Sequence, residues 1–251
     1  MLALLPRPAI LAHRGASAYA PENTLAAFEL ASRQRADGLE LDAKLSADGQ
    51  VVVIHDQSVD RTTDGHGRVG QMDFEALRRL DAGSWYDSSF RGQKIPALEE
   101  VLERVGGQLL VNVELTNYAS PFDDLPRKVA DLLKRGAHEN NVLVSSFNPV
   151  ALLKCFRLLP LVPLGLLVFA GQRGAWARLL FTALVPHGTL HPHYRDATPN
   201  LIARVHRKGR RVFAYTVNQI SDMQALFRSG VDGIFTDDPL RAQGVRAEVF
   251  P

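Results

Sequence analysis

Three acidic residues have a spacing that suits a hard divalent cation. Glu40 and Asp42 are two residues apart in an apolar run that reads as a β-strand, so their side chains share one face of it. Glu114 ends another such run, with Asn112 on the same face. Three converging carboxylates would repel one another unless a cation neutralised them, and oxygen ligands favour Mg²⁺ or Ca²⁺. We therefore expect Glu40, Asp42 and Glu114 to bind a divalent metal ion.

Two histidines and an arginine complete the candidate site. His13 ends the first apolar run, and His55 follows a later one. A pair of imidazoles beside a divalent cation can move protons onto and off a phosphodiester near neutral pH, one accepting and the other donating. The guanidinium of Arg14 can hold a phosphate oxygen through a bidentate contact. The alternative for Arg14 is a salt bridge to Glu22 or Asp56.

The elements that must position these residues follow a regular alternation of short apolar runs and longer amphipathic stretches, which is typical of βα units around a parallel sheet. Strands are predicted over residues 9–13, 38–42, 109–114, 142–146, 163–168, 189–191, 211–216 and 233–236. Helices are predicted over residues 23–35, 98–105, 125–136, 150–158, 175–184, 200–208 and 221–228, with a short one after Pro239. This pattern predicts a single α/β domain, a (β/α)8 TIM barrel of residues 1–251, with reacting residues at the C-terminal ends of its strands.

One segment interrupts the alternation after the second strand. The next strand-like run follows too closely for a parallel crossover. A β-hairpin closed by a two-residue turn at Asp48-Gly49 fits instead, and its register would place Asp42 directly opposite His55. The stretch after it is rich in Asp, Gly, Ser and Arg and is too long for a structureless loop. We predict that residues 57–97 form a small inserted subdomain over the barrel mouth.

Composition and charge exclude several classes of protein. The 251 residues are 46% hydrophobic and 22% charged, which indicates a globular protein. The 29 Lys and Arg against 27 Asp and Glu, without a concentrated basic stripe, argue against nucleic-acid binding. The single cysteine, Cys155, requires no oxidising compartment, the N-terminus lacks a basic signal-peptide region, and prolines and arginines break the most apolar stretch. We expect a cytoplasmic protein without a transmembrane segment, and the sequence indicates no oligomeric state.

An ordered set of motifs resembles one enzyme family. The motifs are His13-Arg-Gly15, Pro21-Glu-Asn-Thr24, Glu40-Leu-Asp42, Asp48-Gly49, His55-Asp56, Asp60-Arg-Thr-Thr63, Asp81-Ala-Gly-Ser-Trp85, Asn112-Val-Glu114, Ser145-Ser-Phe147, Thr216-Val-Asn218 and Gly230-Val-Asp-Gly-Ile-Phe-Thr-Asp237. They extend from about residue 9 to residue 239, nearly the whole chain. In this order they resemble the glycerophosphodiester phosphodiesterase family, in particular its short cytoplasmic bacterial type.

The resemblance implies metal-dependent hydrolysis of glycerophosphodiesters, small-molecule substrates, to sn-glycerol 3-phosphate and an alcohol. It also implies that the substrate's own 2-hydroxyl attacks phosphorus and that water then opens the cyclic glycerophosphate. A hydroxyl already held beside phosphorus saves several kcal/mol of the entropy needed to bring in water. The implied roles are metal binding by Glu40, Asp42 and Glu114, acid/base catalysis by His13 and His55, and phosphate binding by Arg14.

The chain departs from the family at two positions. Family members often have Lys two residues after the third acid, whereas this chain has Thr116, which can donate a hydrogen bond but carries no charge. Tyr215 stands where Trp commonly precedes the Thr-Val-Asn motif, and it would preserve a stacking wall if its ring faces the site. Thr116, Tyr215 and His191 are therefore further candidates for substrate binding, and a structural role is the alternative for His191.

Two other functions are compatible with these motifs. Residues 158–186 would form either an apolar wall or lid for an acyl chain, or a buried strand with the core face of its helix, and we favour the buried arrangement. A wall or lid would suit a lysophospholipase D-type enzyme acting on lysophospholipids. Thr116 favours a non-catalytic barrel that binds glycerol phosphates, whereas the presence of both histidines and all three acids argues against it.

Overall fold

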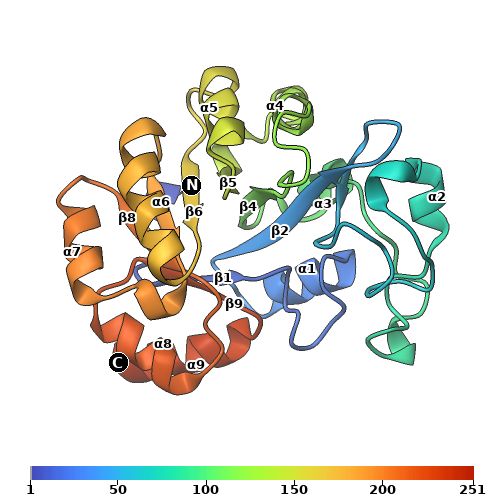
Figure 1. The fold of residues 1–251 in the computed structure, drawn as a ribbon. Coiled ribbons are helices and arrows are strands. Elements are labelled where there is room, and N and C mark those ends of the chain that lie inside the picture. The colour runs from blue at the N-terminus through green and yellow to red at the C-terminus, as the bar shows by residue number, and fades with distance from the viewer. Residues whose placement is uncertain (1) are drawn as a thin grey trace.

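Short runs rich in valine, leucine and isoleucine form eight parallel strands that close into a barrel (Figure 1). The computed structural model describes residues 2–251, without the side chains of Ala3, Arg173, Ala177, Arg178 and Leu179. The barrel strands are β1 (Ala9–Ala12), β2 (Gly38–Leu45), β4 (Leu110–Leu115), β5 (Val142–Ser146), β6 (Leu164–Val168), β7 (Thr189–Pro192), β8 (Arg211–Ala214) and β9 (Gly233–Thr236). Strand β1 pairs with both β2 and β9, which closes the sheet and confirms the predicted (β/α)8 barrel.

The amphipathic stretches between the strands form helices that surround the barrel (Figure 1). They are α1 (Leu25–Arg33), α3 (Leu98–Val105), α4 (Leu125–Arg135), α5 (Pro149–Leu158), α6 (Gly171–Leu184), α7 (Pro199–His206), α8 (Ile220–Arg228) and α9 (Pro239–Val249), with α2 (Phe74–Arg79) outside this ring. Single 3-10 turns cover Leu2–Leu4, Val69–Gln71, Ser88–Phe90, Glu139–Asn141 and Tyr194–Asp196. Among residues 2–251, none of the helices combines the length and the hydropathy needed to span a bilayer.

Alternation along the strands produces two apolar layers and a polar mouth. One set of side chains points outward and packs against the helices, as fully buried Leu39 of β2 does in the same cluster as Phe28 of α1. The set that points inward is apolar near the start of the strands, with Ala9, Leu11, Leu110, Leu143, Phe213 and Phe235 in one cluster. Further along the same strands the inward positions become polar, so the candidate site has an apolar floor.

The predicted hairpin is present, but its register differs from the prediction by one residue. Strand β3 (Val51–Val53) pairs antiparallel with the outer part of β2. The N–H of Ile54 donates to the carbonyl of Asp42 at 2.9 Å, so Asp42 lies opposite Ile54. The prediction that Asp42 lies opposite His55 is therefore wrong.

The turn of the hairpin explains this difference. Three residues, Ala47, Asp48 and Gly49, connect Ser46 to its partner Gln50, whereas a two-residue turn was predicted. Gly49 has φ 78°, the left-handed conformation that a three-residue hairpin loop requires at its last position. His55 consequently follows the paired region of the hairpin, at the C-terminal end of the barrel.

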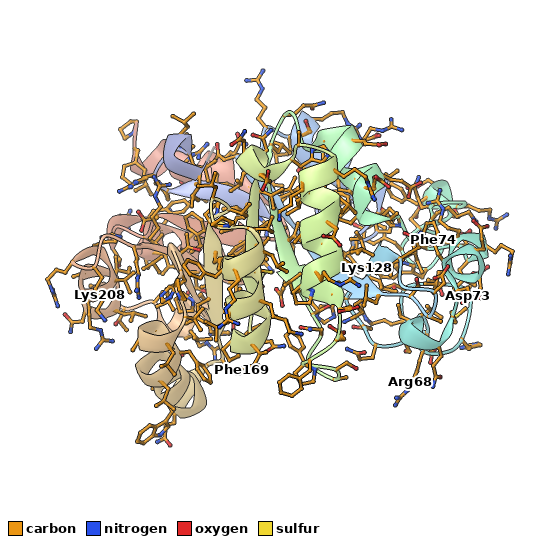
Figure 2. The ribbon with its side chains drawn as sticks, turned by 90° about the horizontal axis from the view of Figure 1, so that it is seen from above. Arg68, Asp73, Phe74, Lys128, Phe169 and Lys208 are labelled. Carbon is orange, nitrogen blue, oxygen red and sulfur yellow. The ribbon has the colours of Figure 1, made fainter. Side chains whose placement is uncertain are left out.

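The segment after the hairpin packs its apolar side chains separately from the barrel core. Its residues Val59, Val69, Leu77, Ala82 and Ile95 form one cluster with Val52 and Ile54 of the hairpin. Figure 1 shows the segment to one side of the barrel, next to the C-terminal end of β2. In Figure 2, its residues Arg68, Asp73 and Phe74 lie at the opposite end of the molecule from Lys208, which follows α7.

The turn after β1 directs the first candidate residues toward the mouth. Arg14 and Gly15 both have left-handed backbone, with φ 55° and φ 83°. A Cβ on Gly15 would lie 2.7 Å from the carbonyl carbon of Ala27 in α1, closer than any real contact. Only glycine therefore allows α1 to approach this turn so closely.

We expect Gly15→Ala to lower the free energy of unfolding by about 2 to 4 kcal/mol, the sum of a left-handed penalty and overpacking against α1. Urea unfolding followed by circular dichroism measures this change. Gly188→Ala is the matched control, because no heavy atom lies within 4 Å of a Cβ at that position and its φ is not left-handed. Equal stability of the two variants would contradict this account of the turn.

Candidate active site

A cavity of about 190 Å³ opens at the C-terminal end of the barrel and is called the mouth cavity below. It is lined by His13, Arg14, Glu40, Asp42, His55, Asn112, Glu114, Phe147, Leu167, Tyr215, Thr216 and Phe235. The structure thus brings together both predicted histidines, the arginine and the three acids, although they come from four separate segments of the chain.

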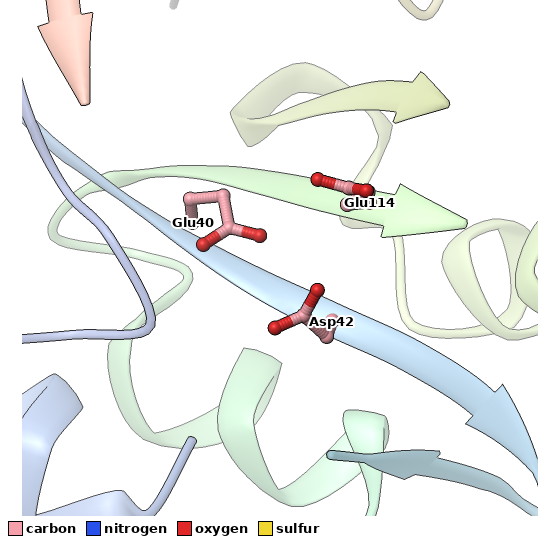
Figure 3. Close-up of side chains that lie close together, drawn as sticks. All are labelled: Glu40, Asp42 and Glu114. Carbon is pink, nitrogen blue, oxygen red and sulfur yellow. The ribbon is translucent and has the colours of Figure 1, made fainter. Parts of the chain in front are cut away.

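The three acids point toward one another from two neighbouring strands (Figure 3). One carboxylate oxygen from each of Glu40, Asp42 and Glu114 lies within 4.8 Å of those of the other two. Asp42 is directly opposite Glu114 in the parallel pairing of β2 with β4, and Glu40 precedes Asp42 on the same face. Pairing and strand alternation alone therefore bring these side chains together, and they are called the acid cluster below.

Burial and mutual repulsion raise the pKa values of two carboxyl groups in the acid cluster. Burial, with the adjacent charge of Asp42, raises the pKa of Glu114 to about 8. Burial, followed by the charges of Asp42 and Glu114, raises the pKa of Glu40 well above its ordinary value. Protons or a cation must therefore offset the negative charge near neutral pH.

Unpartnered oxygens around the acid cluster fit a bound cation. Among the described residues, Oε1 of Glu40, Oδ1 of Asn112 and Oγ of Ser145 are buried without a hydrogen-bond partner. Asn112 is directly opposite Glu40, and Ser145 is directly opposite Glu114. Buried acceptors without donors are costly, and a hard cation among oxygen atoms would remove that cost. The donor set therefore suits the predicted Mg²⁺ or Ca²⁺, and Asn112 joins the residues that face it.

Arg14 contacts the acid cluster and a further carboxylate. Its backbone N–H donates to Oε2 of Glu40 at 2.9 Å, and its Nε lies 3.3 Å from Oδ2 of Asp42. Its guanidinium also donates to Glu22 at 2.8 Å. The salt bridge to Glu22 therefore exists alongside a position in the mouth cavity, and the two alternatives for Arg14 do not exclude each other.

His13 is oriented by a carboxylate at the end of β9. Its Nδ1 lies 2.7 Å from Oδ1 of Asp237, which also accepts a hydrogen bond from Ser17 at 3.2 Å. The other oxygen of Asp237, Oδ2, accepts a hydrogen bond from Asn218 at 2.6 Å. Burial alone would raise the pKa of Asp237, but the hydrogen bond and charge of His13 lower it below its ordinary value. An ionised partner at Nδ1 keeps that nitrogen protonated and leaves Nε2 for proton transfer.

His55 has a matching carboxylate partner. Its Nδ1 lies 2.7 Å from Oδ1 of Asp56, and Nε of Arg61 donates to the other oxygen of Asp56 at 2.6 Å. This bond from Arg61, with the bond from His55, lowers the pKa of Asp56 to about 2. Arg61 continues to Glu22 through two bonds of 2.8 Å, which links the inserted segment to the salt bridge of Arg14.

Asp56 and Asp237 were not predicted to have a role in the site. The available signal was their place in the sequence, because Asp56 follows His55 directly and Asp237 follows the last barrel strand. A carboxylate at such a place can hold the second nitrogen of an imidazole, as both do here. Arg61 belongs to the motif Asp60-Arg-Thr-Thr63, but the motif alone did not indicate which carboxylates it would contact.

One wall of the mouth cavity is aromatic. Phe147 and Tyr215 line it, with ring centroids 5.8 Å apart in an edge contact, and the hydroxyl of Tyr215 donates to the carbonyl of Val168 at 2.8 Å. Phe147 stacks on Phe169 at 4.4 Å and meets Tyr118, whose hydroxyl donates to Glu114 in the acid cluster. The ring of Tyr215 therefore faces the mouth cavity. Strand alternation could not predict this orientation, because β8 ends at Ala214, one residue before Tyr215.

Thr116 does not line the mouth cavity. It lies in a neighbouring cavity of about 240 Å³, called the side cavity below. Its hydroxyl donates to the carbonyl of Ala43 and accepts a bond from Nζ of Lys44, both at 2.8 Å. The structure therefore assigns the Thr116 hydroxyl to protein partners rather than to the mouth cavity.

His191 lies below the mouth cavity, inside the barrel. It is fully buried, with its ring centroid 5.1 Å from that of Phe235 and 5.7 Å from that of Phe213. Burial lowers its pKa to about 3, and its Nε2 bonds the Thr189 hydroxyl at 2.8 Å. Strand β7 does turn His191 inward, but Phe235 separates it from the cavity, so the geometry matches the structural alternative.

The acid cluster predicts a pH-dependent response to divalent cations. Without a cation, raised carboxyl pKa values stabilise the fold below the ordinary value of 4.5, and this contribution is lost as the pH rises through about 8. A cation replaces those protons, so the rise in melting temperature caused by MgCl₂ or CaCl₂ should be larger at about pH 9 than at about pH 6. Scanning fluorimetry measures it. Glu114→Gln should lose most of the increase, and an equal shift at both pH values would contradict the interpretation.

Comparison with known sequences identifies the family. The model of the glycerophosphoryl diester phosphodiesterase family matches residues 13–241. The chain is 39% identical over 231 residues to the glycerophosphodiester phosphodiesterase of Caldanaerobacter subterraneus subsp. tengcongensis, covering 92% of this chain and 94% of that protein. It is 35% identical over 244 residues to the glycerophosphodiester phosphodiesterase of Bacillus altitudinis, covering 96% and 98%.

Solved structures give the same result. An Oleispira antarctica phosphodiesterase in complex with the product sn-glycerol-3-phosphate has a TM-score of 0.86 and 30% identity, over 96% of this chain and 97% of that one. The glycerophosphodiester phosphodiesterase of Thermotoga maritima has a TM-score of 0.74 and 26% identity, over 95% and 97%. Sequence and structure together show that the chain belongs to the glycerophosphoryl diester phosphodiesterase family.

Proposed function

We propose that this chain hydrolyses glycerophosphodiesters to sn-glycerol 3-phosphate and an alcohol. The observation that carries the proposal is the meeting of two carboxylate-paired histidines, Arg14 and the acid cluster in one cavity. Relatives named as glycerophosphodiester phosphodiesterases, at 35% and 39% identity over most of the chain, support it. The Oleispira antarctica structure, which contains the product sn-glycerol-3-phosphate, supports the identity of the product.

Glu40, Asp42 and Glu114 would hold the divalent cation, Mg²⁺ or Ca²⁺, with Asn112 beside them. When bound, such a cation offsets the negative charge that grows on the phosphoryl oxygens. Arg14 adds a fixed positive charge beside the same carboxylates, and its guanidinium can hold a phosphate oxygen.

The two histidines supply the proton transfers. One imidazole accepts the proton of the substrate's 2-hydroxyl as that oxygen attacks phosphorus, and the other donates a proton to the departing alcohol. This step yields a cyclic glycerophosphate. In the second step water attacks phosphorus with the histidine roles reversed, one ring P–O bond breaks, and sn-glycerol 3-phosphate forms. Asp237 and Asp56 keep Nδ1 of His13 and His55 engaged, so that Nε2 is the exchanging atom in each ring.

We also propose that residues 1–251 act as one catalytic domain with residues 57–97 as an inserted subdomain. The inserted segment supplies Arg61, which donates to both Asp56 and Glu22. The contribution of the inserted segment to the site is therefore electrostatic, because Arg61 forms ion pairs with the carboxylate partners of His55 and Arg14.

A lysophospholipid substrate is a second candidate, favoured by exposed apolar groups that begin at the aromatic wall. Phe169 is 55% exposed while stacked on Phe147 of the mouth cavity. The favoured buried arrangement of this region is confirmed for β6, whose residues are all buried. The prediction of a buried arrangement is wrong for one face of α6, where Trp176, Leu180 and Leu184 are 67%, 55% and 66% exposed. An acyl chain leaving the cavity past Phe169 could contact this face.

His13→Ala and His55→Ala should each reduce turnover of glycerophosphocholine by about 10²-fold or more, because each removes a proton-transfer group. Circular dichroism should show an unchanged fold, since neither side chain belongs to the apolar clusters. His66→Ala is the matched control, because its side chain is 89% exposed and lies outside the mouth cavity. Near-normal turnover by either of the first two variants would refute the assignment.

Rates on glycerophosphocholine and lysophosphatidylcholine distinguish the two substrate classes. We expect kcat/KM to be higher for glycerophosphocholine, because most of the residues that line the mouth cavity are charged or polar and suit a small polar diester. Phe169→Ser should leave that value unchanged, since Phe169 does not line the cavity. A higher value for lysophosphatidylcholine that falls in Phe169→Ser would instead establish the second candidate.

A further inference from the structure

Lys44 is a buried cation that the proposed mechanism does not use. It lies on β2 two residues after Asp42 and on the same face, with only 6% of its surface exposed. Lysine is almost never buried to this extent unless it is paired with a charge. Its position beside a site for an anionic substrate therefore requires a physical explanation.

The pairing of β2 with β4 places Lys44 next in line after the acid cluster. Asp42 lies opposite Glu114, and the following pair on this face is Lys44 with Thr116. Nζ of Lys44 donates to the hydroxyl of Thr116 at 2.8 Å and to its carbonyl at 3.2 Å. Because a strand rises about 3.3 Å per residue, Lys44 starts about 7 Å further toward the open end of the barrel than Asp42.

Both partners of Lys44 are neutral oxygens. Within the part of the chain that the structure describes, no carboxylate lies within the 4.0 Å ion-pair distance of its Nζ. An ammonium group has three donors, and two of them are used on Thr116. Arg14, by contrast, is paired with Glu22 and Asp42. Lys44 thus keeps one donor that an incoming anion could accept, while the charges of Asp42, Glu114 and Asp56 act on its ammonium group without forming an ion pair.

We propose that Lys44 binds the anionic phosphodiester as a second substrate cation beside Arg14, an inference that rests on the proposed function. Arg14 approaches Asp42 from the β1 side, whereas Lys44 is held by Thr116 at the end of β4. The two cations therefore come from different strand units, Arg14 from the turn after β1 and Lys44 from β2. Lys44 lines the side cavity of about 240 Å³ and not the mouth cavity, so a diester that contacts both cations would extend from one cavity into the other.

The test is binding of sn-glycerol 3-phosphate in the presence of MgCl₂, measured by calorimetry together with steady-state kinetics on glycerophosphocholine. Lys44→Met, which removes the charge but keeps a similar shape, should raise the Kd and the KM by at least about tenfold, the loss expected for one charged hydrogen bond. Its affinity for Mg²⁺ should stay within about twofold, since Lys44 is not a ligand. Lys128→Met on α4 is the control and should change neither value.

A second variant returns the charge to the same place from the neighbouring strand. Because Oγ1 of Thr116 touches Nζ of Lys44, the double variant Lys44→Met with Thr116→Lys should recover most of the lost affinity. Failure of the double variant to bind better than Lys44→Met would overturn the proposal, as would an unchanged Kd in Lys44→Met. If Lys44→Met alone does not fold, the double variant decides by the same criterion against the unaltered enzyme. If the unaltered enzyme neither binds nor hydrolyses these ligands, the proposed function itself has failed.

Discussion

Repulsion among the three carboxylates of the acid cluster is the constraint on which the rest of the barrel mouth depends. Parallel pairing of β2 with β4 forces these groups together, whatever surrounds them. The chain then supplies one donor to each carboxylate: the backbone N–H of Arg14, the amide of Asn23 and the hydroxyl of Tyr118. These donors fix the carboxylates but leave much of their charge unbalanced, as the raised pKa values of Glu40 and Glu114 show. A site built in this way is organised around a cation that the protein itself does not provide.

Around the acid cluster, pairs of oppositely charged side chains form a connected series. Asp56 connects His55 to Arg61, Arg61 connects to Glu22, and Glu22 connects to Arg14. This series joins the inserted segment, the hairpin and the turn after β1, which are distant in sequence. A side chain of the inserted segment therefore influences a histidine and an arginine that it does not touch. Such partly buried pairs contribute more to orientation than to net stability, because desolvation offsets much of their attraction.

The periodicity of apolar residues was sufficient to predict the barrel, because its strands are short and apolar and are separated by amphipathic helices. Each stretch of the sequence therefore matches the pattern of only one type of element. The acid cluster could be predicted for the same reason, since strand alternation alone places Glu40 with Asp42. Details that depend on loop length could not be predicted. One additional residue in the hairpin turn moved the partner of Asp42 from His55 to Ile54. The orientation of Tyr215 depends on where β8 ends. The separation of His191 from the mouth cavity depends on the ring of Phe235, which packs against it.

The bond between His13 and Asp237 spans 224 positions of the chain. His13 belongs to the first strand unit, and its orienting carboxylate follows the last one, so the pair cannot form until β9 has closed the barrel against β1. During synthesis on a ribosome the hairpin with His55 and Asp56 can fold early, because its contacts are local, whereas the His13 half of the site must wait for the final strand. In a chain that still lacks β9, the candidate residue His13 therefore has no orienting carboxylate.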